Sequence, residues 1–215
     1  ARDLAKAWDE VTLSELGFDK GNAQTVRVMP KGQEAGSQDI KDAEKFFRSI
    51  GVQNARFFTG QLTQEIDGQT FYADAAVTED GSVLIRADSE EYSAFELAKH
   101  EGYHLLAKRW PEMAAKIQKR LLGEGKITKE MIESYVDAYA GIYGDDTDAY
   151  VEEIVADTYA GMNRTDYGTN KLRADVKMEV GQWQKKSGSA RAPPAKMSAA
   201  KNQTTKNYQG VNLAE

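Results

Sequence analysis

The feature that most constrains this chain is one pentapeptide, His100-Glu101-Gly102-Tyr103-His104, which contains both histidines of the 215 residues. Residues four apart lie about one turn apart on the same face of an α-helix, so two imidazoles can reach one metal ion. The glutamate between them can hold and deprotonate a metal-bound water. The spacing therefore predicts a helix with a metal site on one face.

Chance is a poor explanation for this pentapeptide. With two histidines in the chain, an accidental H-E-x-x-H is expected roughly once in a thousand such sequences. The periodicity around it is helical, and Ser93 falls near the two histidines on a helical projection. The opposite side of the helix is predicted to face the core, and it consists of Phe95, Ala98, Gly102 and Leu105.

The rest of the ligand set is restricted by what the chain lacks. It contains no cysteine, which excludes disulfides, thiolate zinc sites and thiol catalysis. Ala107 and Trp110 stand where the longer H-E-x-x-H-x-x-G-x-x-H pattern, or its Asp-ligated version, needs glycine and the third ligand. A third ligand must therefore be a carboxylate from a later helix, and two imidazoles with a carboxylate suit a single zinc ion among divalent metals.

The best candidate for that carboxylate lies in a predicted helix over residues 148–162. Glu153 and Asp157 are four residues apart on one face, among apolar neighbours. We predict that Glu153 binds the metal and that Asp157 accepts the free ring N–H of a ligand histidine. Glu152 lies about 100° away around the helix and remains the alternative ligand. A solvated acidic face is the other interpretation of these residues.

The two motifs together resemble the gluzincin zinc metallopeptidases. Glu153, Ala156, Asp157, Tyr159 and Ala160 match the second motif of that family, E-x-x-A-[ND]-x-[FY]-A, position by position. The likeness covers residues 80–162 and is nearest to small ImmA/IrrE-like and minigluzincin domains, which also occur within large proteins of phages and mobile elements. Gly102 and Tyr103 depart from the family, in which a bulky residue and then glycine more often precede the second histidine.

The resemblance implies a zinc metalloendopeptidase in which Glu101 activates the metal-bound water and the metal polarises the peptide carbonyl. It also implies a tyrosine or histidine that stabilises the oxyanion; among Tyr143, Tyr150, Tyr159 and Tyr167, we select Tyr150, although a packed core tyrosine is the competing interpretation. The substrate is expected to be a protein or peptide lying along an edge strand, either 82–86 or 71–75. The alternative function is a silent or latent metal-containing interaction domain of a mobile-element protein.

The predicted fold is α+β and zincin-like: a small, mostly antiparallel sheet on the active-site helix, followed by a helical half. Residues 1–186 are predicted to form one domain, and residues 187–215 a basic tail. We expect a helix over 2–16 and a hairpin of strands 70–78 and 82–88. Asp88, with Glu91, is the predicted N-cap of the active-site helix. Further strands are predicted over 25–29 and 54–59, and further helices over 38–50, 111–122, 128–139 and 172–185.

The charge balance limits the partners. A net charge of −6 argues against nucleic-acid and anionic-membrane partners, which select a basic surface. No apolar run is long enough to span a bilayer, and the N-terminal residues lack the apolar core of a signal peptide, which favours a cytoplasmic location over secretion. The sequence gives no oligomeric state.

Overall fold

The computed structural model describes residues 8–16, 24–32, 36–66, 69–77, 81–162, 172–187 and 207–208. The chain forms two compact units, one of residues 1–101 with 202–215 and one of residues 102–201. The division falls within one continuous helix. Most of the predicted tail lies outside the described residues, and the predicted domain limits stay a prediction.

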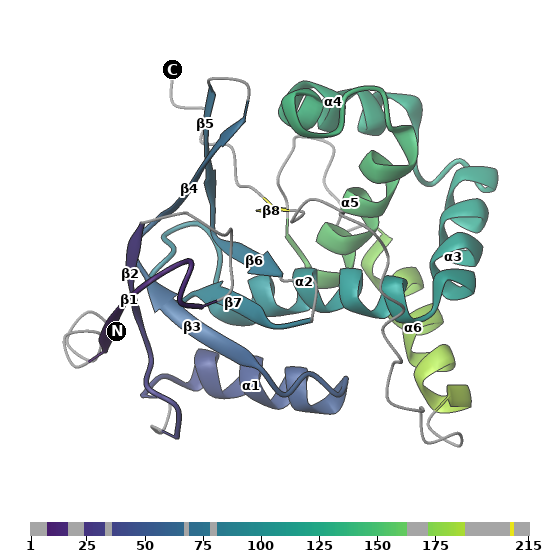
Figure 1. Cartoon of the computed structure of the whole chain (residues 1–215). Helices are drawn as coiled ribbons and strands as arrows, with labels where there is room; N and C mark the ends of the chain where they lie inside the picture. Colours follow the sequence, from purple (N-terminus) through teal and green to yellow (C-terminus); the bar gives the residue numbers. More distant parts are fainter. Residues whose placement is uncertain are drawn as a thin grey trace. The chain divides into compact units, whose positions relative to one another are not determined.

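The first unit is built on a mixed sheet with strand order β1-β2-β3-β7-β6-β8 (Figure 1). β3 and β7 are parallel, and the other neighbouring pairs are antiparallel. A separate antiparallel pair is formed by β4 and β5. The strands are β1 (Asp9–Thr12), β2 (Thr25–Val28), β3 (Ala55–Thr59), β4 (Leu62–Ile66), β5 (Gln69–Ala73), β6 (Ala75–Val77), β7 (Val83–Arg86) and β8 (Asn207–Tyr208).

The parallel pair forms the centre of this unit. Val83, Leu84 and Ile85 are successive residues of β7, and all are fully buried, as are Phe57 and Phe58 of β3. Because successive side chains of a strand point to opposite faces, both faces of the sheet must be covered here. In Figure 1, α1 (Gln38–Ser49) lies below β3. The first half of α2 (Ala94–Arg109) also packs on the sheet.

Two predictions about strands can be compared with the strand order of this sheet. The predicted hairpin is confirmed at its turn-proximal end, because Val77 pairs with Val83 and Ala75 with Ile85 across antiparallel β6 and β7. Residues 70–73 of the first predicted strand instead belong to β5 and pair with β4. The substrate strand predicted at 82–86 is not at an edge, since β7 has β3 on one side and β6 on the other.

The helix predicted over 2–16 is wrong at residues 9–12, which form β1; residues 1–7 lie outside the described part. Val11 pairs with Val26 of β2 and is half-buried. The apolar spacing that suggested a helix also fits this strand, and pairing with β2 decides between the two.

The helical half of the fold is confirmed. α3 and α6 match their predicted helices, and α4 continues four residues beyond its predicted end at 139. α5 packs against α3, α4 and α6 and is the central helix of the second unit. Among the described residues, none of the helices is both long and apolar enough to span a membrane. The bounds are α3 (Pro111–Gly123), α4 (Lys129–Tyr143), α5 (Thr147–Ala160) and α6 (Arg173–Ser187).

Candidate metal centre

The N-terminus of α2 is held by two kinds of cap. Ser93 and Glu96 form a capping box: the Ser93 hydroxyl accepts from Glu96 N at 3.2 Å, and the Glu96 carboxylate accepts from Ser93 N at 3.0 Å. The carboxylate of Asp39, on α1, accepts from Ala94 N at 2.6 Å and Phe95 N at 3.1 Å. These bonds satisfy orphan amides of the helix and fix where its first turn lies.

The predicted cap of this helix, Asp88 with Glu91, is therefore wrong. Asp88 instead accepts from Arg86 Nε at 2.9 Å and from Gly60 N. The sequence has the capping pattern twice, as D-x-x-E at 88–91 and as S-x-x-E at 93–96. Asp88 of the first pattern forms an ion pair with Arg86, and the second pattern caps the helix.

The middle of α2 is buried around its whole circumference. His100 and Glu101 are each 1% exposed and His104 is 6% exposed. The predicted core face is confirmed at Ala98 and Gly102, which are buried, whereas Phe95 and Leu105 at its ends are only half-buried. The contrast between a dry face and an open site face does not appear. Charged and imidazole groups placed this deep need specific partners.

Two carboxylates of α5 are buried as deeply as the histidines of α2. Glu153 is 2% exposed and Asp157 is fully buried. Asp146 caps the N-terminus by accepting from Ala149 N at 3.1 Å. Gly161 ends the helix with φ of 85°, in the left-handed region that favours glycine.

The two helices supply a set of three possible metal ligands. His100 and His104 share α2, and His104 and Glu153 lie in the same unit. One nitrogen or oxygen atom of each of the three lies within 4.8 Å of the others. His104 Nε2 lies 3.6 Å from Glu153 Oε1. The predicted His-His-Glu set is thus brought together in the structure.

Glu152 takes a place beside this set. Its Oε1 lies 2.7 Å from His104 Nδ1, while its side chain remains 33% exposed. With Nδ1–H donating to Glu152, His104 presents the lone pair of Nε2 on the side of Glu153. A carboxylate on the far ring nitrogen fixes the tautomer of a ligand histidine. For His104, this is the place that the sequence analysis assigned to Asp157.

Asp157 has a different partner. Its Oδ2 accepts from the Tyr135 hydroxyl at 2.7 Å, and both groups are buried. Its role toward a ligand histidine stays a prediction.

Tyrosines of α4 reach both carboxylates of α5. Tyr143 donates its hydroxyl to Glu153 Oε1 at 2.8 Å, two helical turns along α4 from Tyr135. Tyr139 lies between them, with ring centroids 5.8 Å from Tyr135 and 6.1 Å from Tyr143. In the sequence, Tyr143 is only one of several candidate tyrosines. The spacing 135, 139, 143 on one helical face was the signal that could have identified it.

Tyr150, the predicted oxyanion stabiliser, is a buried residue of α5. It is 1% exposed, and its hydroxyl donates to the carbonyl oxygen of Gly144. Burial raises its pKa, and the carboxylates of Asp145 and Asp146 add to that shift. Its predicted role, like that of Glu101, stays a prediction.

The donor set fits a zinc ion. Imidazole nitrogen and carboxylate oxygen bind zinc at about 2.0–2.2 Å, which separates two ligands of a tetrahedral site by about 3.4 Å. The 3.6 Å between His104 Nε2 and Glu153 Oε1 is close to that separation. Tyr143 and Glu152 also orient two of the three ligands by hydrogen bonds, as ligands of metal sites commonly are. The three residues therefore form a candidate metal site.

Comparison of the chain with protein-family models, with curated proteins and with solved structures finds no match.

Proposed function

We propose that this protein is a zinc-dependent metallopeptidase of the zincin type, with a site resembling that of the gluzincins. The observation that carries the proposal is the buried set of His100, His104 and Glu153, contributed by an H-E-x-x-H helix and a later helix. Three protein ligands leave a fourth position of a tetrahedral zinc for water or substrate, which is the composition of catalytic zinc sites.

Glu101 is the proposed general base. When bound, zinc would lower the pKa of a coordinated water and polarise a substrate carbonyl. Glu101 follows His100 on α2 and is 1% exposed, so its carboxylate would act in a low-dielectric environment. There it would take a proton during attack on the peptide carbonyl and pass it to the leaving amine.

Tyr143 is a better-placed partner for the developing negative charge than Tyr150. Its hydroxyl lies 2.8 Å from the ligand atom Glu153 Oε1, whereas the Tyr150 hydroxyl is engaged by the Gly144 carbonyl. A phenol beside the ligand set can turn from Glu153 to an oxyanion without crossing the core. We retain Tyr150 as the sequence-based alternative. The proposed substrate is a protein or peptide.

The test is Glu101→Gln, with Glu112→Gln on the exposed first turn of α3 as the matched control. Zinc content is measured after dialysis, and cleavage of a pool of unstructured peptides is followed by mass spectrometry. We expect one zinc per chain in all three proteins and a loss of hydrolysis of about 10²–10⁴-fold in Glu101→Gln alone. Full hydrolysis by Glu101→Gln contradicts the mechanism.

The deep burial of the ligands favours one rival, a structural metal in a silent or latent interaction domain. His100 at 1% and Glu153 at 2% exposure resemble a closed site more than an open one. That rival predicts a zinc-loaded wild-type chain that cleaves none of the peptides but unfolds more easily when zinc is removed.

A further inference from the structure

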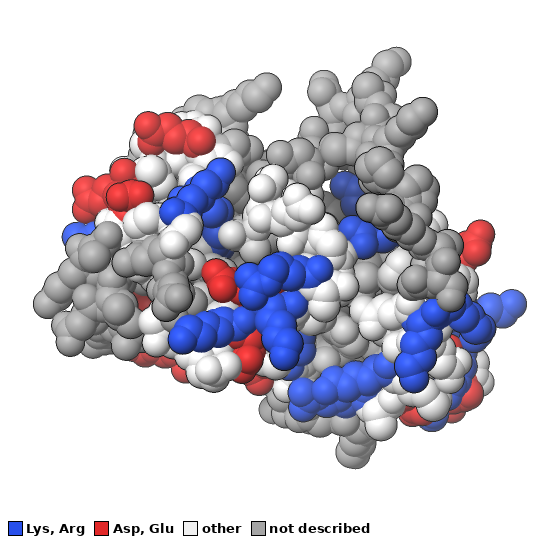
Figure 2. Space-filling view, turned by 90° about the horizontal axis from the view of Figure 1, so that it is seen from below, with Lys and Arg blue, Asp and Glu red and all other residues white. Residues whose placement is uncertain are grey.

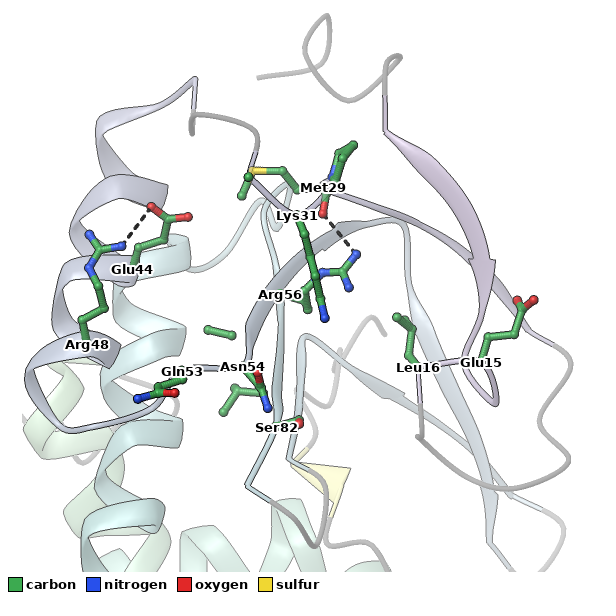
Figure 3. A pocket seen from close by; sticks show the side chains of 14 residues that line it. Glu15, Leu16, Met29, Lys31, Glu44, Arg48, Gln53, Asn54, Arg56 and Ser82 are labelled. Atoms are coloured by element: carbon green, nitrogen blue, oxygen red, sulfur yellow. Dashed lines mark hydrogen bonds and ion pairs between the residues drawn. The ribbon is translucent and has the colours of Figure 1, made fainter. Parts of the chain in front are cut away.

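The first unit contains a hollow lined by both charged and apolar side chains. Its volume is about 650 Å³, within the range of small-molecule sites. It lies where β3 and β7 begin, between the C-terminal half of α1 and the turn after β1 (Figure 3). None of its lining residues belongs to the metal set or contacts it in the described structure, so the hollow is independent of the proposed function.

Three cations from three separate elements line the hollow. They are Lys31 after β2, Arg48 on α1 and Arg56 on β3. Figure 3 shows Lys31 and Arg56 projecting into the space between α1 and the turn that carries Glu15. In the view from below, Lys and Arg side chains on the visible face lie beside Asp and Glu side chains (Figure 2). Two carboxylates, Glu15 and Glu44, line the same hollow, so the positive charge that is left over depends on which cations they pair with.

The two carboxylates of the hollow are already engaged. Glu15 Oε2 accepts from the backbone N of Thr12 at 2.7 Å and from its hydroxyl at 2.8 Å. Glu44 forms an i, i+4 ion pair with Arg48 at 3.8 Å. Among the described residues, neither Lys31 nor Arg56 forms an ion pair with a carboxylate.

Arg56 has hydrogen-bonding capacity to spare. Its Nη2 donates to the carbonyl oxygen of Met29 at 3.2 Å, and its Nε is buried with no hydrogen-bond partner in the described structure. A guanidinium has five N–H donors in a planar fork that matches the two oxygens of a carboxylate or phosphate. Asn54 and Ser82 add polar groups to the same wall.

We propose that this hollow binds a small molecule through an oxyanion, either a phosphate or a carboxylate group, held by Arg56 and Lys31. Arg56 supplies the planar fork, and Lys31 supplies a mobile point charge beside it (Figure 3). The apolar residues Leu16, Met29 and Val83 lie beside them and would contact the body of the ligand.

The test is calorimetric titration of the full chain with two probes, sodium pyrophosphate and sodium succinate, at low ionic strength. We expect at least one probe to bind at millimolar or lower concentration, and raising the salt concentration to weaken that binding. Tighter binding of pyrophosphate identifies a phosphate site, and tighter binding of succinate a carboxylate site. Failure of both probes to bind overturns the proposal.

Three variants connect binding to these residues. Lys31→Gln, at an exposed position, is expected to weaken the bound probe about tenfold. Arg56→Lys keeps the charge but removes the fork, and it should also weaken binding about tenfold. Lys45→Gln removes an exposed charge of α1 outside the hollow and should change the affinity less than twofold. Equal affinities in Lys31→Gln, Lys45→Gln and the wild type overturn the assignment to these residues. Circular dichroism establishes that each variant is folded.

Discussion

The candidate metal centre and the hollow lined by Lys31 and Arg56 differ in whether their charged groups have partners. At the centre, His104 is bracketed by Glu152 and Glu153, and each buried acid of α5 receives a tyrosine hydroxyl. In the hollow, Lys31 and Arg56 have no carboxylate partner among the described residues, and Arg56 Nε has no acceptor. The first region is enclosed and its groups are oriented; the second is open and holds surplus donors.

The difference indicates how each region would respond to a ligand. Buried side chains that are already oriented lose little conformational freedom when they bind an ion, so we expect strong and selective binding at the metal centre. Surplus donors on an open wall lose water and side-chain freedom on binding, which makes a weaker and salt-sensitive site. The same distinction predicts that removing a side chain from the metal centre lowers metal binding or stability strongly, whereas removing one from the hollow changes stability little.

The largest effect is expected from removing a proposed metal ligand. Glu153→Gln should reduce bound zinc from one ion per chain to nearly none, measured by elemental analysis after dialysis, because a neutral amide is a poor zinc ligand. Glu152→Gln is the matched control and should retain the ion with about 10–100-fold weaker affinity. The reverse order would make Glu152 the ligand. With free zinc at 100 times Kd, the wild type should gain about 2.7 kcal/mol of stability over its metal-free form.

A smaller effect is expected at the cap of α2. Asp39→Ala removes the carboxylate that receives Ala94 N and Phe95 N, and it should lower the free energy of unfolding by about 1–2 kcal/mol in urea denaturation. Lys31→Gln in the hollow should change it by less than about 0.5 kcal/mol. Asp42→Ala, on the same helix as Asp39, controls for helix propensity. Equal losses for Asp39→Ala and Lys31→Gln would remove the distinction between the two regions.

The smallest effect is expected in an ion-pair network between α3 and α6. Burial alone would raise the pKa of Glu179, but hydrogen bonds from Lys116, at 3.1 Å, and Arg120 outweigh it and lower that pKa. A carboxyl with a lowered folded pKa stabilises the fold above its unfolded pKa, about 4.3, and loses that contribution as pH falls through its folded pKa. The stability gap between wild type and Glu179→Gln should therefore narrow between pH 6 and pH 3, and a constant gap would contradict this.

Local pattern was enough to predict most elements and the three residues of the candidate metal site. The i, i+4 spacing of the histidines and the apolar surroundings of Glu153 are properties of single helices, and both appear in the structure. The helix predicted at the N-terminus failed because β1 depends on pairing with β2, which no local period encodes. The Asp39 cap and the Glu152 contact join residues 55 and 48 positions apart, and such contacts follow from tertiary packing.

The hydroxyl contacts from α4 to α5 have a consequence for how this sequence can change over time. Tyr135 with Asp157 and Tyr143 with Glu153 are two couples, each joining positions on different helices. A phenylalanine at 143 would leave the buried Glu153 carboxylate short of a donor, and an alanine at 153 would leave the half-buried Tyr143 hydroxyl short of an acceptor. Among descendants of this chain, substitutions at these positions should therefore arise in pairs, and such paired changes would record the architecture in the sequences themselves.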